Sequence, residues 1–499
     1  MSGHSERDFE TAIEAGLTAT GGYEARSPGD WDETRALFPG DVTGFLRDSQ
    51  PTKWAALEAL LGPKTDGTVL DSLAKELELK GTLHVLRHGF KCYGKNFRMA
   101  YFRPNTAMNP EAAESYARNR LTITRQVAFT SVLKKADGKH RRCIIDVTLA
   151  VNGIPVVTAE LKNPLTGQRA ADAVRQYETE RDERDLLFAF KKRALVHFAV
   201  DPDEVWMTTR LKGKETVFLP FNRGDTHGAG NPPVEGNWKT HYLWDEVLAR
   251  DSLLEILQRF MHLEVKEKKI KTDKGVRTVR KETMIFPRYH QLDAVRKLVA
   301  HARAHGAGSN YLVQHSAGSG KSNSIAWLAH RLASLHDAND AKVFHSVIVV
   351  TDRRVLDQQL QDTIYQFEHK TGVVEKIDED TQQLARALSQ GTPIVITTIQ
   401  KFPFISQALS TLEKKGSGVK IETAGKRFAV IVDEAHSSQS GETATALKGM
   451  LNKEGIEAAI AGQLSDEEDR ELSESEIGAL RDAMRRARQP NLSFFAFTA

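Results

Sequence analysis

The stretch that most constrains the fold is Tyr311–Ile325, which reads YLVQHSAGSGKSNSI. A short apolar run leads into a glycine-rich turn, and a segment with helical periodicity follows. This order of strand, glycine-rich loop and helix is typical of phosphate-binding loops, in which backbone N–H groups and the helix N-terminus face phosphate oxygens. The alternative is a Gly/Ser-rich connection without a ligand, which the position of the GKS tripeptide disfavours.

The loop supplies most of a predicted nucleotide site. Lys321 can reach the β- and γ-phosphates of ATP, and the Ser322 hydroxyl can ligate Mg²⁺. His315 stands where such loops usually carry their first glycine. The nucleotide-binding residues predicted here are Gly318, Ser319, Gly320, Lys321 and Ser322.

Length and composition describe a protein of several domains. The 499 residues are too many for one core and predict two to four domains, with 40% hydrophobic and 27% charged residues. Apolar runs are far too short to span a bilayer, and the polar N-terminus lacks the apolar segment of a secretory signal. Two distant cysteines, Cys92 and Cys143, suit a reducing compartment and read as buried thiols. We therefore expect a cytoplasmic protein without a membrane segment.

Charge is informative locally. The net charge is only +3, but Glu264–Lys281 carries eight basic residues against three acidic ones. Smaller basic clusters are Lys191–Arg193 and the series Arg118, Arg120 and Arg125. Such stretches can hold phosphates. A solvated linker or a surface hairpin is an equally good interpretation of the first stretch.

The N-terminal half contains one segment with a clear chemical pattern, Cys143–Lys162. Two β-rich runs flank Asn152-Gly153, a strong hairpin signal. Asp146 lies in the first run, whereas Glu160 and Lys162 share a face of the second. Two carboxylates on one sheet face can bind Mg²⁺, and a neighbouring lysine can orient a water and stabilise charge on a phosphate. The alternative is that ELK is a surface tripeptide on an edge strand.

The hairpin register tests this metal site. A two-residue loop would pair Asp146 with Ala159 and turn Glu160 to the other face. A three-residue loop, or a compensating bulge, pairs Asp146 with Glu160. We therefore predict the longer loop or a bulge.

The rest of the N-terminal half predicts a small α/β domain and a connector. An amphipathic helix over residues 6–17 carries Glu10 and Glu14, which could lie beside an active site or on a plain surface. The other predicted elements are a loop-rich segment at 21–50, helices at 54–61 and 70–79, mixed strand and turn at 82–108, a helix opening at 170–177, strands at 194–200 and 205–208, a linker at 223–240 and a helical connector at 242–263.

The C-terminal half supplies the remaining parts of a nucleotide site. Gln291, next to aromatic residues and upstream of the loop, can read an adenine through its amide. The apolar run 428–432 ends in Asp433, which can hold Mg²⁺, and Glu434, which can polarise the attacking water. Further buried strands are predicted at 346–351, 393–398 and 493–499, with a polar, inserted excursion over 448–488.

Alternating strands and helices of this kind predict a parallel sheet with ligands at the carboxyl ends of the strands. The predicted fold is therefore α/β throughout. We predict an α/β domain with a mixed sheet over residues 1–225, a linker and helical, basic connector over 226–283, and a parallel-sheet domain with the phosphate-binding loop over 284–499. By resemblance, the first domain is similar to restriction nucleases and the last to RecA-like P-loop domains.

In order, the motifs Gln291, HSAGSGKS, VVTDRR, TTIQKF, DEAH and the terminal FTA resemble the first RecA-like lobe of a superfamily 2 helicase. The pattern of Asp146 with ExK resembles the PD-(D/E)xK nuclease core. Together they resemble the restriction (R) subunit of a type I restriction-modification enzyme. The resemblance implies a catalytic set of Asp146, Glu160, Lys162 and Glu434, metal ligands Asp146, Glu160, Ser322 and Asp433, the cofactors ATP and Mg²⁺, and as partners double-stranded DNA and the methyltransferase and specificity subunits.

The chain departs from this family at two points. Gln176 matches the glutamine of the family's QxxxY motif, but Glu180 stands at the tyrosine position and Tyr177 is a candidate substitute. Glu10 is a candidate for the family's N-terminal helix carboxylate. The family's second RecA-like lobe does not follow Ala499. We therefore expect a fragment with impaired motor activity.

Two other functions fit the same motifs. One is a repair or anti-phage helicase-nuclease that works without a methyltransferase, and the other is a catalytically silent DNA-binding remnant.

Overall fold

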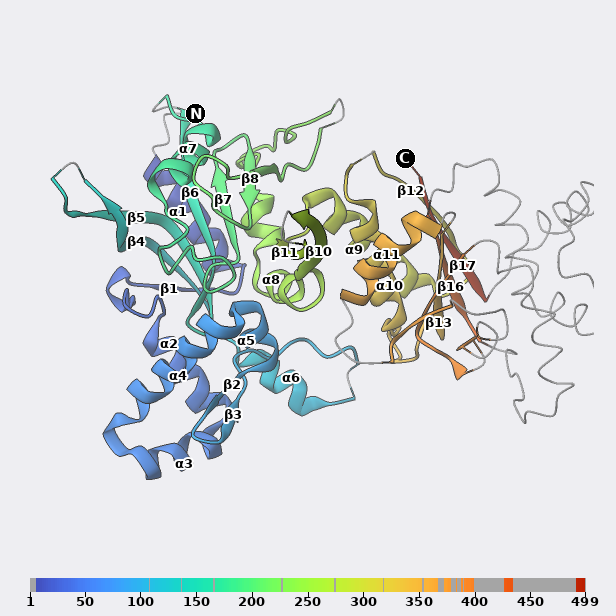
Figure 1. Ribbon diagram of the computed structural model, residues 1–499, viewed down its shortest axis with the longest axis horizontal. Helices are drawn as coiled ribbons and strands as arrows, with labels where there is room; N and C mark the ends of the chain where they lie inside the picture. Colours follow the sequence, from blue (N-terminus) through green and yellow to red (C-terminus); the bar gives the residue numbers. More distant parts are fainter. Residues whose placement is uncertain are drawn as a thin grey trace, which may run out of the picture. The chain divides into compact units, whose positions relative to one another are not determined.

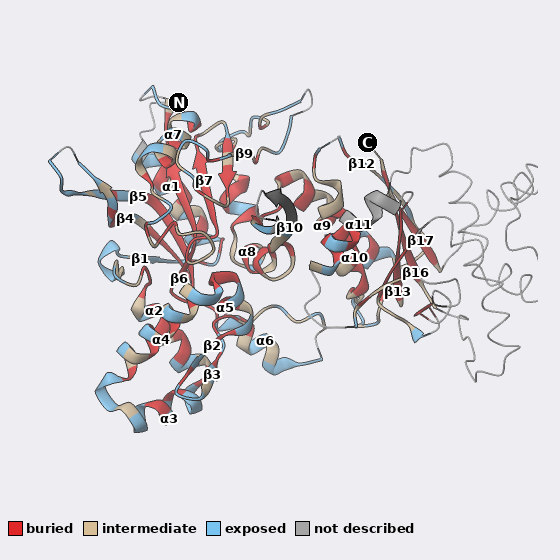
Figure 2. Cartoon of the chain, viewed as in Figure 1, coloured by how far each residue is buried: buried red, intermediate tan, exposed pale blue. Residues whose placement is uncertain are grey.

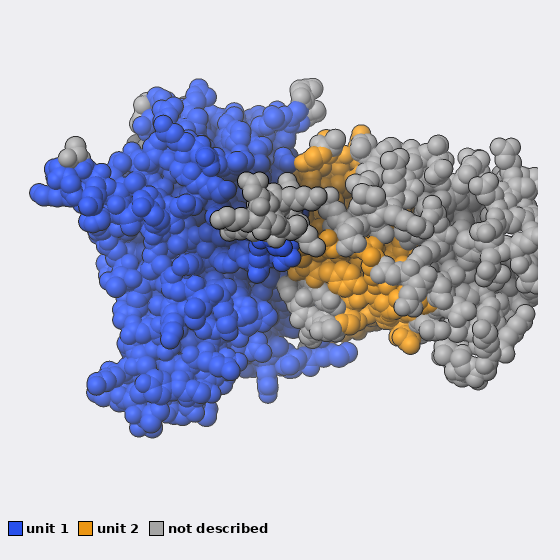
Figure 3. Space-filling view, in the orientation of Figure 1, with its two compact units in different colours: residues 1–289 blue, residues 290–499 orange. Residues whose placement is uncertain are grey.

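The computed structural model divides into two compact units, residues 1–289 and 290–499, which Figure 3 colours separately. It describes residues 6–106, 108–135, 137–164, 167–225, 228–272, 275–316, 318–351, 354–366, 372–377, 383, 387–388, 390–398, 426–433 and 491–498, without the side chains of 6, 268–277, 354–359 and 398. The finer division at 225/226 and 283/284 stays a prediction, and residues 226–283 fall within the first unit.

The first unit is built on a seven-stranded mixed sheet in the order β1-β4-β5-β6-β7-β8-β9 (Figure 1). Its β1/β4 and β6/β7 pairs are parallel and its other pairs are antiparallel. The predicted α/β domain with a mixed sheet is therefore confirmed. The strands are β1 (Glu24–Arg26), β4 (Leu121–Lys134), β5 (His140–Val151), β6 (Ile154–Leu161), β7 (Val196–Val200), β8 (Val205–Thr208) and β9 (Leu219–Pro220).

Helices α1 (Glu6–Ala19) and α7 (Ala170–Glu180) contact this sheet, α7 along the crossover between the parallel strands β6 and β7. A group of short elements precedes the long strands of the sheet. They are η1 (Pro28–Asp30), α2 (Pro39–Ser49), α3 (Pro51–Leu61), η2 (Gly62–Lys64), α4 (Thr65–Lys80), α5 (Thr82–His88), the hairpin of β2 (Phe90–Cys92) and β3 (Lys95–Phe97), and α6 (Pro110–Ala117).

Two sequence predictions in this region were wrong. Residues 39–49 form a helix where a loop was expected, and residues 82–88 form a helix where strand and turn were expected. Glycines Gly40 and Gly44 made the first helix hard to predict. Gly44 has a packing reason, since a Cβ there would lie 2.2 Å from Nη1 of Arg120.

The predicted helical connector is divided into three short pieces, the π-helical η4 (Leu243–Val247), α8 (Arg250–Glu255) and the π-helical η5 (Ile256–Phe260). The basic stretch after it forms an antiparallel hairpin of β10 (His262–Thr272) and β11 (Gly275–Ile285). The sequence left open whether this stretch is a solvated linker or a surface hairpin, and the structure shows a hairpin.

The second unit contains a six-stranded parallel sheet in the order β12-β17-β16-β13-β15-β14. This confirms the predicted parallel-sheet domain. Helix α9 (Tyr289–His305) enters the unit, and the other elements are β12 (Asn310–Gln314), α10 (Lys321–Ala333), β13 (Ser346–Thr351), α11 (Arg354–Gln366), β14 (Val374–Lys376), β15 (Ile394–Thr398), β16 (Phe428–Val432) and β17 (Leu492–Thr498). The predicted excursion over 448–488 lies outside the described residues.

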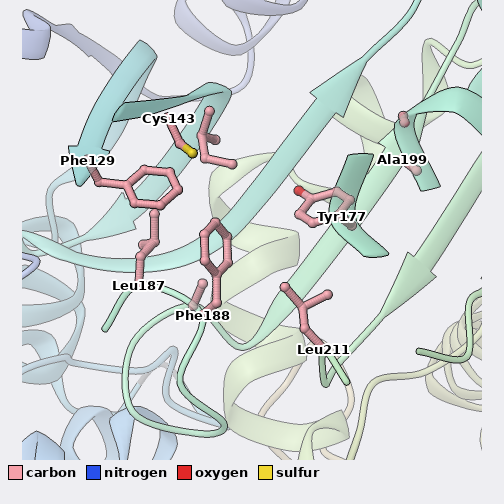
Figure 4. Close-up of a cluster of buried hydrophobic side chains, with 10 residues drawn as sticks. Phe129, Cys143, Tyr177, Leu187, Phe188, Ala199 and Leu211 are labelled. Atoms are coloured by element: carbon pink, nitrogen blue, oxygen red, sulfur yellow. The ribbon is translucent and has the colours of Figure 1, made fainter. Parts of the chain in front are cut away.

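Many residues of the two sheets are buried, and Figure 2 colours them red. In the first unit one cluster joins Phe129, Tyr177 and Phe188, with the buried thiol of Cys143 at its margin (Figure 4). Both cysteines are buried and free, as predicted. No helix in the described part of the chain is long and apolar enough to cross a membrane.

Candidate functional site

A β-bulge sets the register of the β5–β6 hairpin. Asn152 and Gly153 form a two-residue turn with φ of 51° and 81°, and Val151 pairs with Ile154. The register then shifts between Leu149 and Ala150, so that Val147 pairs with Ala159. Continued by one residue, this register sets Asp146 opposite Glu160, and the Asp146 Oδ2 accepts a hydrogen bond from the Leu161 N–H at 2.8 Å. Of the two forms predicted, a three-residue loop or a bulge, the structure has the bulge. The register extended in this way places the two carboxylates on one face.

Glu160 is buried and paired with an arginine. Strand β6 lies between β5 and β7, which excludes the edge-strand interpretation of the ELK tripeptide. Arg181, at the end of α7, donates from Nε to Glu160 Oε1 at 2.7 Å and from Nη2 to the Ile144 carbonyl at 2.7 Å. Both side chains are almost fully buried, at 2% and 0% exposure. Arg181 therefore fixes one oxygen of Glu160.

The other carboxylate oxygen fits a metal ion. Glu160 Oε2 is buried and has no hydrogen-bond partner among the described residues. Burial, and then the nearby Asp146 carboxylate, raise the pKa of Glu160 well above its ordinary value, while Arg181 opposes this rise. Such a buried, unsatisfied acceptor is costly unless a ligand completes it.

The donor set is small. In the part of the chain that the structure describes, no group of three or more His, Cys, Asp or Glu side chains could hold a metal ion. Mg²⁺ usually takes one or two carboxylates and fills its other positions with water and substrate phosphates. The pair Asp146 and Glu160 fits that ion.

Lys162 follows directly after β6, two residues beyond Glu160. Its backbone N–H donates to the Val200 carbonyl at 2.9 Å, which ties the end of β6 to β7. The side chain is only 8% exposed. An ammonium so placed can act on a group held at the carboxylate pair rather than on bulk solvent.

Asp146 opens into a pocket of about 670 Å³ at the first helix. Glu10 of α1 is buried here, and Arg125 donates to its Oε2 from Nε and Nη2 at 3.0 and 2.8 Å. Gln126 Nε2 donates to Glu10 Oε1 at 2.9 Å and lies 3.5 Å from Asp146 Oδ1. Burial raises the pKa of Glu10, with Arg125 opposing. The lining consists of Arg7, Glu10, Glu14, Arg26, Pro28, Arg125, Gln126 and Asp146.

The residues compared with the QxxxY motif lie on α7. Tyr177 is fully buried, and its hydroxyl lies 2.9 Å from Thr158 Oγ1, which also contacts His197 Nδ1 at 2.8 Å. Glu180 pairs with Arg141 at 2.9 Å. Tyr177 thus braces α7 against β6, and neither Gln176 nor Tyr177 lines the pocket at Asp146.

The predicted phosphate-binding loop joins β12 to α10 in the second unit. Gly318 and Gly320 have φ of 74° and 86°, which a residue with a Cβ adopts only at a cost. A Cβ on Gly320 would also lie 2.4 Å from Gln291 Nε2. Gln291 donates from that nitrogen to the Ser319 and Gly320 carbonyls at 3.2 and 2.9 Å. Its amide therefore holds the loop, and its reading of an adenine stays a prediction.

Lys321 and Asp433 meet where α10 begins and β16 ends. Lys321 begins α10, and its Nζ lies 3.3 Å from Asp433 Oδ1. Ser322 follows on the first turn of the same helix. The parallel sheet thus brings together the predicted phosphate-binding lysine and the predicted metal-binding aspartate. Glu434 lies outside the described residues.

His315 has a structural partner inside the loop. Its Nδ1 lies 2.8 Å from Ser319 Oγ, and its backbone N–H donates to the Thr498 carbonyl at 2.7 Å. Burial, then the neighbouring His290 and Lys321, lower the pKa of His315 to about 4. A neutral imidazole in this position braces Ser319 in place of the usual glycine.

Sequence reasoning missed three residues of the first site. Arg181 and Gln126 were not predicted at all, and Arg125 was noted only for its charge. None lies in a motif, and Arg125 is separated from Glu10 by 115 residues. A basic residue near the end of the helix after the ExK strand is the one weak signal available for Arg181.

Comparisons with known proteins agree with this arrangement. Residues 103–216 match the family model described as type I restriction enzyme R protein N terminus, and residues 290–462 match the SWI2/SNF2 ATPase model. The first match contains the whole β4–β6 region and Lys162. The second contains the predicted phosphate-binding loop and Asp433.

Curated relatives point the same way. The chain is 27% identical to the type I restriction enzyme HindI endonuclease subunit of Haemophilus influenzae over 337 residues, covering 66% of this chain and 29% of the relative. It is 25% identical to the SauCOLORF180P endonuclease subunit of Staphylococcus aureus over 334 residues, covering 66% and 30%. The matches thus span less than a third of these relatives. The resemblance to the N-terminal part of a type I restriction R subunit is confirmed.

A solved fragment described as an HsdR subunit of a type I restriction enzyme from Vibrio vulnificus YJ016 also matches, with 14% identity and a TM-score of 0.21. The match covers 75% of this chain and 54% of that one. A TM-score of this size supports no inference about the fold.

Proposed function

We propose that this chain carries the nuclease and the first motor lobe of a type I restriction subunit. It would cleave double-stranded DNA with Mg²⁺ at the β5–β6 hairpin and bind ATP at the loop between β12 and α10. The observation that carries the proposal is the bulged register, which sets Asp146 opposite a buried Glu160 whose Oε2 has no hydrogen-bond partner among the described residues.

Each residue of the hairpin has a defined task in this proposal. Asp146 and the Oε2 of Glu160 would hold Mg²⁺, which when bound supplies a Lewis acid for phosphodiester hydrolysis. Arg181 keeps Glu160 Oε1 engaged, so the second oxygen faces the metal position. Lys162 would orient the attacking water and stabilise negative charge that builds on the phosphate. The Leu161 N–H holds Asp146 in its orientation.

The motor residues would bind MgATP. Lys321 would exchange its contact with Asp433 for the β- and γ-phosphates, which leaves Asp433 and the Ser322 hydroxyl to hold Mg²⁺. Gln291 would contact the adenine, and Glu434 would polarise the hydrolytic water. We also propose that ATP hydrolysis is coupled to DNA translocation and that the chain assembles with methyltransferase and specificity subunits. The support for both is the similarity to endonuclease subunits of type I restriction enzymes.

Cleavage of plasmid DNA tests the proposal. The purified chain is incubated with Mg²⁺, and the rates of nicking and linearisation are compared with those of Asp146→Asn and Lys162→Met. Lys139→Met, on the loop before β5, serves as a matched surface control. We expect metal-dependent cleavage by the wild type and the control only. Equal traces from all four proteins would contradict the nuclease and favour a silent DNA-binding remnant.

A further inference from the structure

Gln126 has an unusual backbone for a residue in the middle of a strand. Its φ is +56°, in the left-handed region that residues with a Cβ seldom adopt. The register is the same on both sides of it, since Arg125 pairs with Val147 and Val127 with Ile145. Gln126 therefore stands opposite Asp146 without an inserted residue. Nothing in the ladder itself requires this conformation.

The strained backbone brings two consecutive side chains to the same carboxylate. In a regular strand, neighbouring side chains point to opposite faces. Here Arg125 and Gln126 both donate to Glu10, one to Oε2 and the other to Oε1. Strain of this kind persists where surrounding structure imposes it, and it concentrates at functional sites.

The amide of Gln126 lies between two acids. Its Nε2 donates to Glu10 at 2.9 Å and lies 3.5 Å from Asp146 Oδ1, the outer limit of a hydrogen bond. The other Asp146 oxygen is already held by the Leu161 N–H. An –NH₂ group has two donors and so can satisfy both acids at once, which a hydrocarbon side chain cannot do.

We propose that Gln126 is a positioning residue of the nuclease site, whose strained backbone places the side-chain amide between Glu10 and Asp146 and so orients the Asp146 carboxylate for the metal ion. This inference rests on the proposed function of the hairpin site. If it is right, the positive φ of Gln126 serves metal binding and lowers the stability of the fold. A residue that only supports the fold would show the opposite pattern.

Two substitutions separate the effect of the Gln126 side-chain amide from the effect of its strained backbone. Gln126→Met keeps the size of the side chain and its backbone strain but removes the donor. Gln126→Asn tolerates a positive φ better, and its shorter side chain cannot span the two acids. The matched control is Tyr93→Asn, because Tyr93 also has a positive φ, of 45°, and lies 61% exposed in the β2–β3 turn away from the pocket.

The experiment measures Mn²⁺ affinity by electron paramagnetic resonance, DNA cleavage and the melting temperature in the full chain. We expect both Gln126 variants to lose about tenfold in Mn²⁺ affinity and cleavage, as is typical when a residue that orients a ligand is removed. The melting temperature of Gln126→Asn should equal or exceed that of the wild type. Tyr93→Asn should keep wild-type affinity and cleavage.

The possible outcomes separate a failure of the Gln126 proposal from a failure of the proposed nuclease function. Wild-type Mn²⁺ affinity in both Gln126 variants, with a clear loss in Asp146→Ala, would overturn the inference alone. A fall in melting temperature that accompanies the loss in both variants would overturn it in favour of a purely structural role. Equal Mn²⁺ affinity in the wild type and Asp146→Ala would contradict the proposed function, and the inference with it.

Discussion

The two candidate sites of this chain are assembled in different ways. The proposed nuclease site uses one hairpin, where a bulge close to the turn decides whether two carboxylates meet, and its charges are buried against Arg181. The proposed nucleotide site gathers residues that follow separate parallel strands, and its charges are partly accessible, as in the contact between Lys321 and Asp433. Strand register therefore determines whether the residues of the first site meet, and sheet topology determines whether those of the second site do.

The largest expected effect is a double dissociation between the sites. Asp146→Ala should lower Mg²⁺-dependent cleavage by about a thousandfold, because several kcal/mol of transition-state stabilisation depend on the metal. Lys321→Ala should abolish binding of a fluorescent ATP analogue. Each variant should keep the other activity. Loss of both activities in either variant would show that the two sites are not separate.

The next effect concerns the buried pair of Arg181 and Glu160. Arg181→Met should destabilise the first unit by about 3–5 kcal/mol, because it removes the cation that is hydrogen-bonded to the buried Glu160 carboxylate. Adding Glu160→Gln should recover much of this loss in urea unfolding, since the two effects are coupled.

An exposed ion pair provides the control for that measurement. Lys239 and Asp203 lie 2.7 Å apart, each 41% exposed. Lys239→Met should cost less than about 1 kcal/mol. A similar cost for Arg181→Met and Lys239→Met would show that burial does not set the energetics of the nuclease site.

In the nucleotide site the matched pair is Gly320→Ala and Gly318→Ala. Both positions have positive φ, so each substitution should cost about 1–2 kcal/mol. Only Gly320→Ala also places a Cβ against Gln291, whereas a Cβ on Gly318 would meet no described residue within 4 Å apart from its chain neighbours. Gly320→Ala should therefore weaken nucleotide binding more. Equal losses would show that Gln291 does not pack against the loop.

The last effect is a pH dependence of the first unit, and it is small near neutral pH. Burial lowers the pKa of His197 from 6.5 to about 3. Between these values the unfolded chain binds a proton that the folded chain does not, so stability falls as pH falls below 6.5, by up to about 1.4 kcal/mol per pH unit. The slope of unfolding free energy against pH should decrease by one proton in His197→Gln. An unchanged slope would show that His197 titrates normally.

Local signals predicted much of this structure. The apolar runs 346–351 and 428–432 became β13 and β16 at those bounds, because continuous apolar residues suit a parallel sheet buried on both faces. The hairpin register was predictable as a three-residue loop or a bulge, since the proposed chemistry requires one register, and the structure has the bulge.

Other features could not be read from the sequence because their causes are not local. Helix α2 contains Gly44, for which the close approach of Arg120 gives a reason only in the folded chain. Arg181 reaches Glu160 only after α7 has packed on β6, and it stands in a charged run that resembles solvated surface. The positive φ of Gln126 depends on partners on α1 and β5.

The most direct test of the central claim is the position of a metal ion in a crystal of this chain soaked with Mn²⁺, located by anomalous scattering. We predict a peak bound by Asp146 and by Oε2 of Glu160, with Arg181 still on Oε1. The proposed metal site would be contradicted if Mn²⁺ occupied only the Lys321–Asp433 region and Glu160 Oε2 still lacked a ligand.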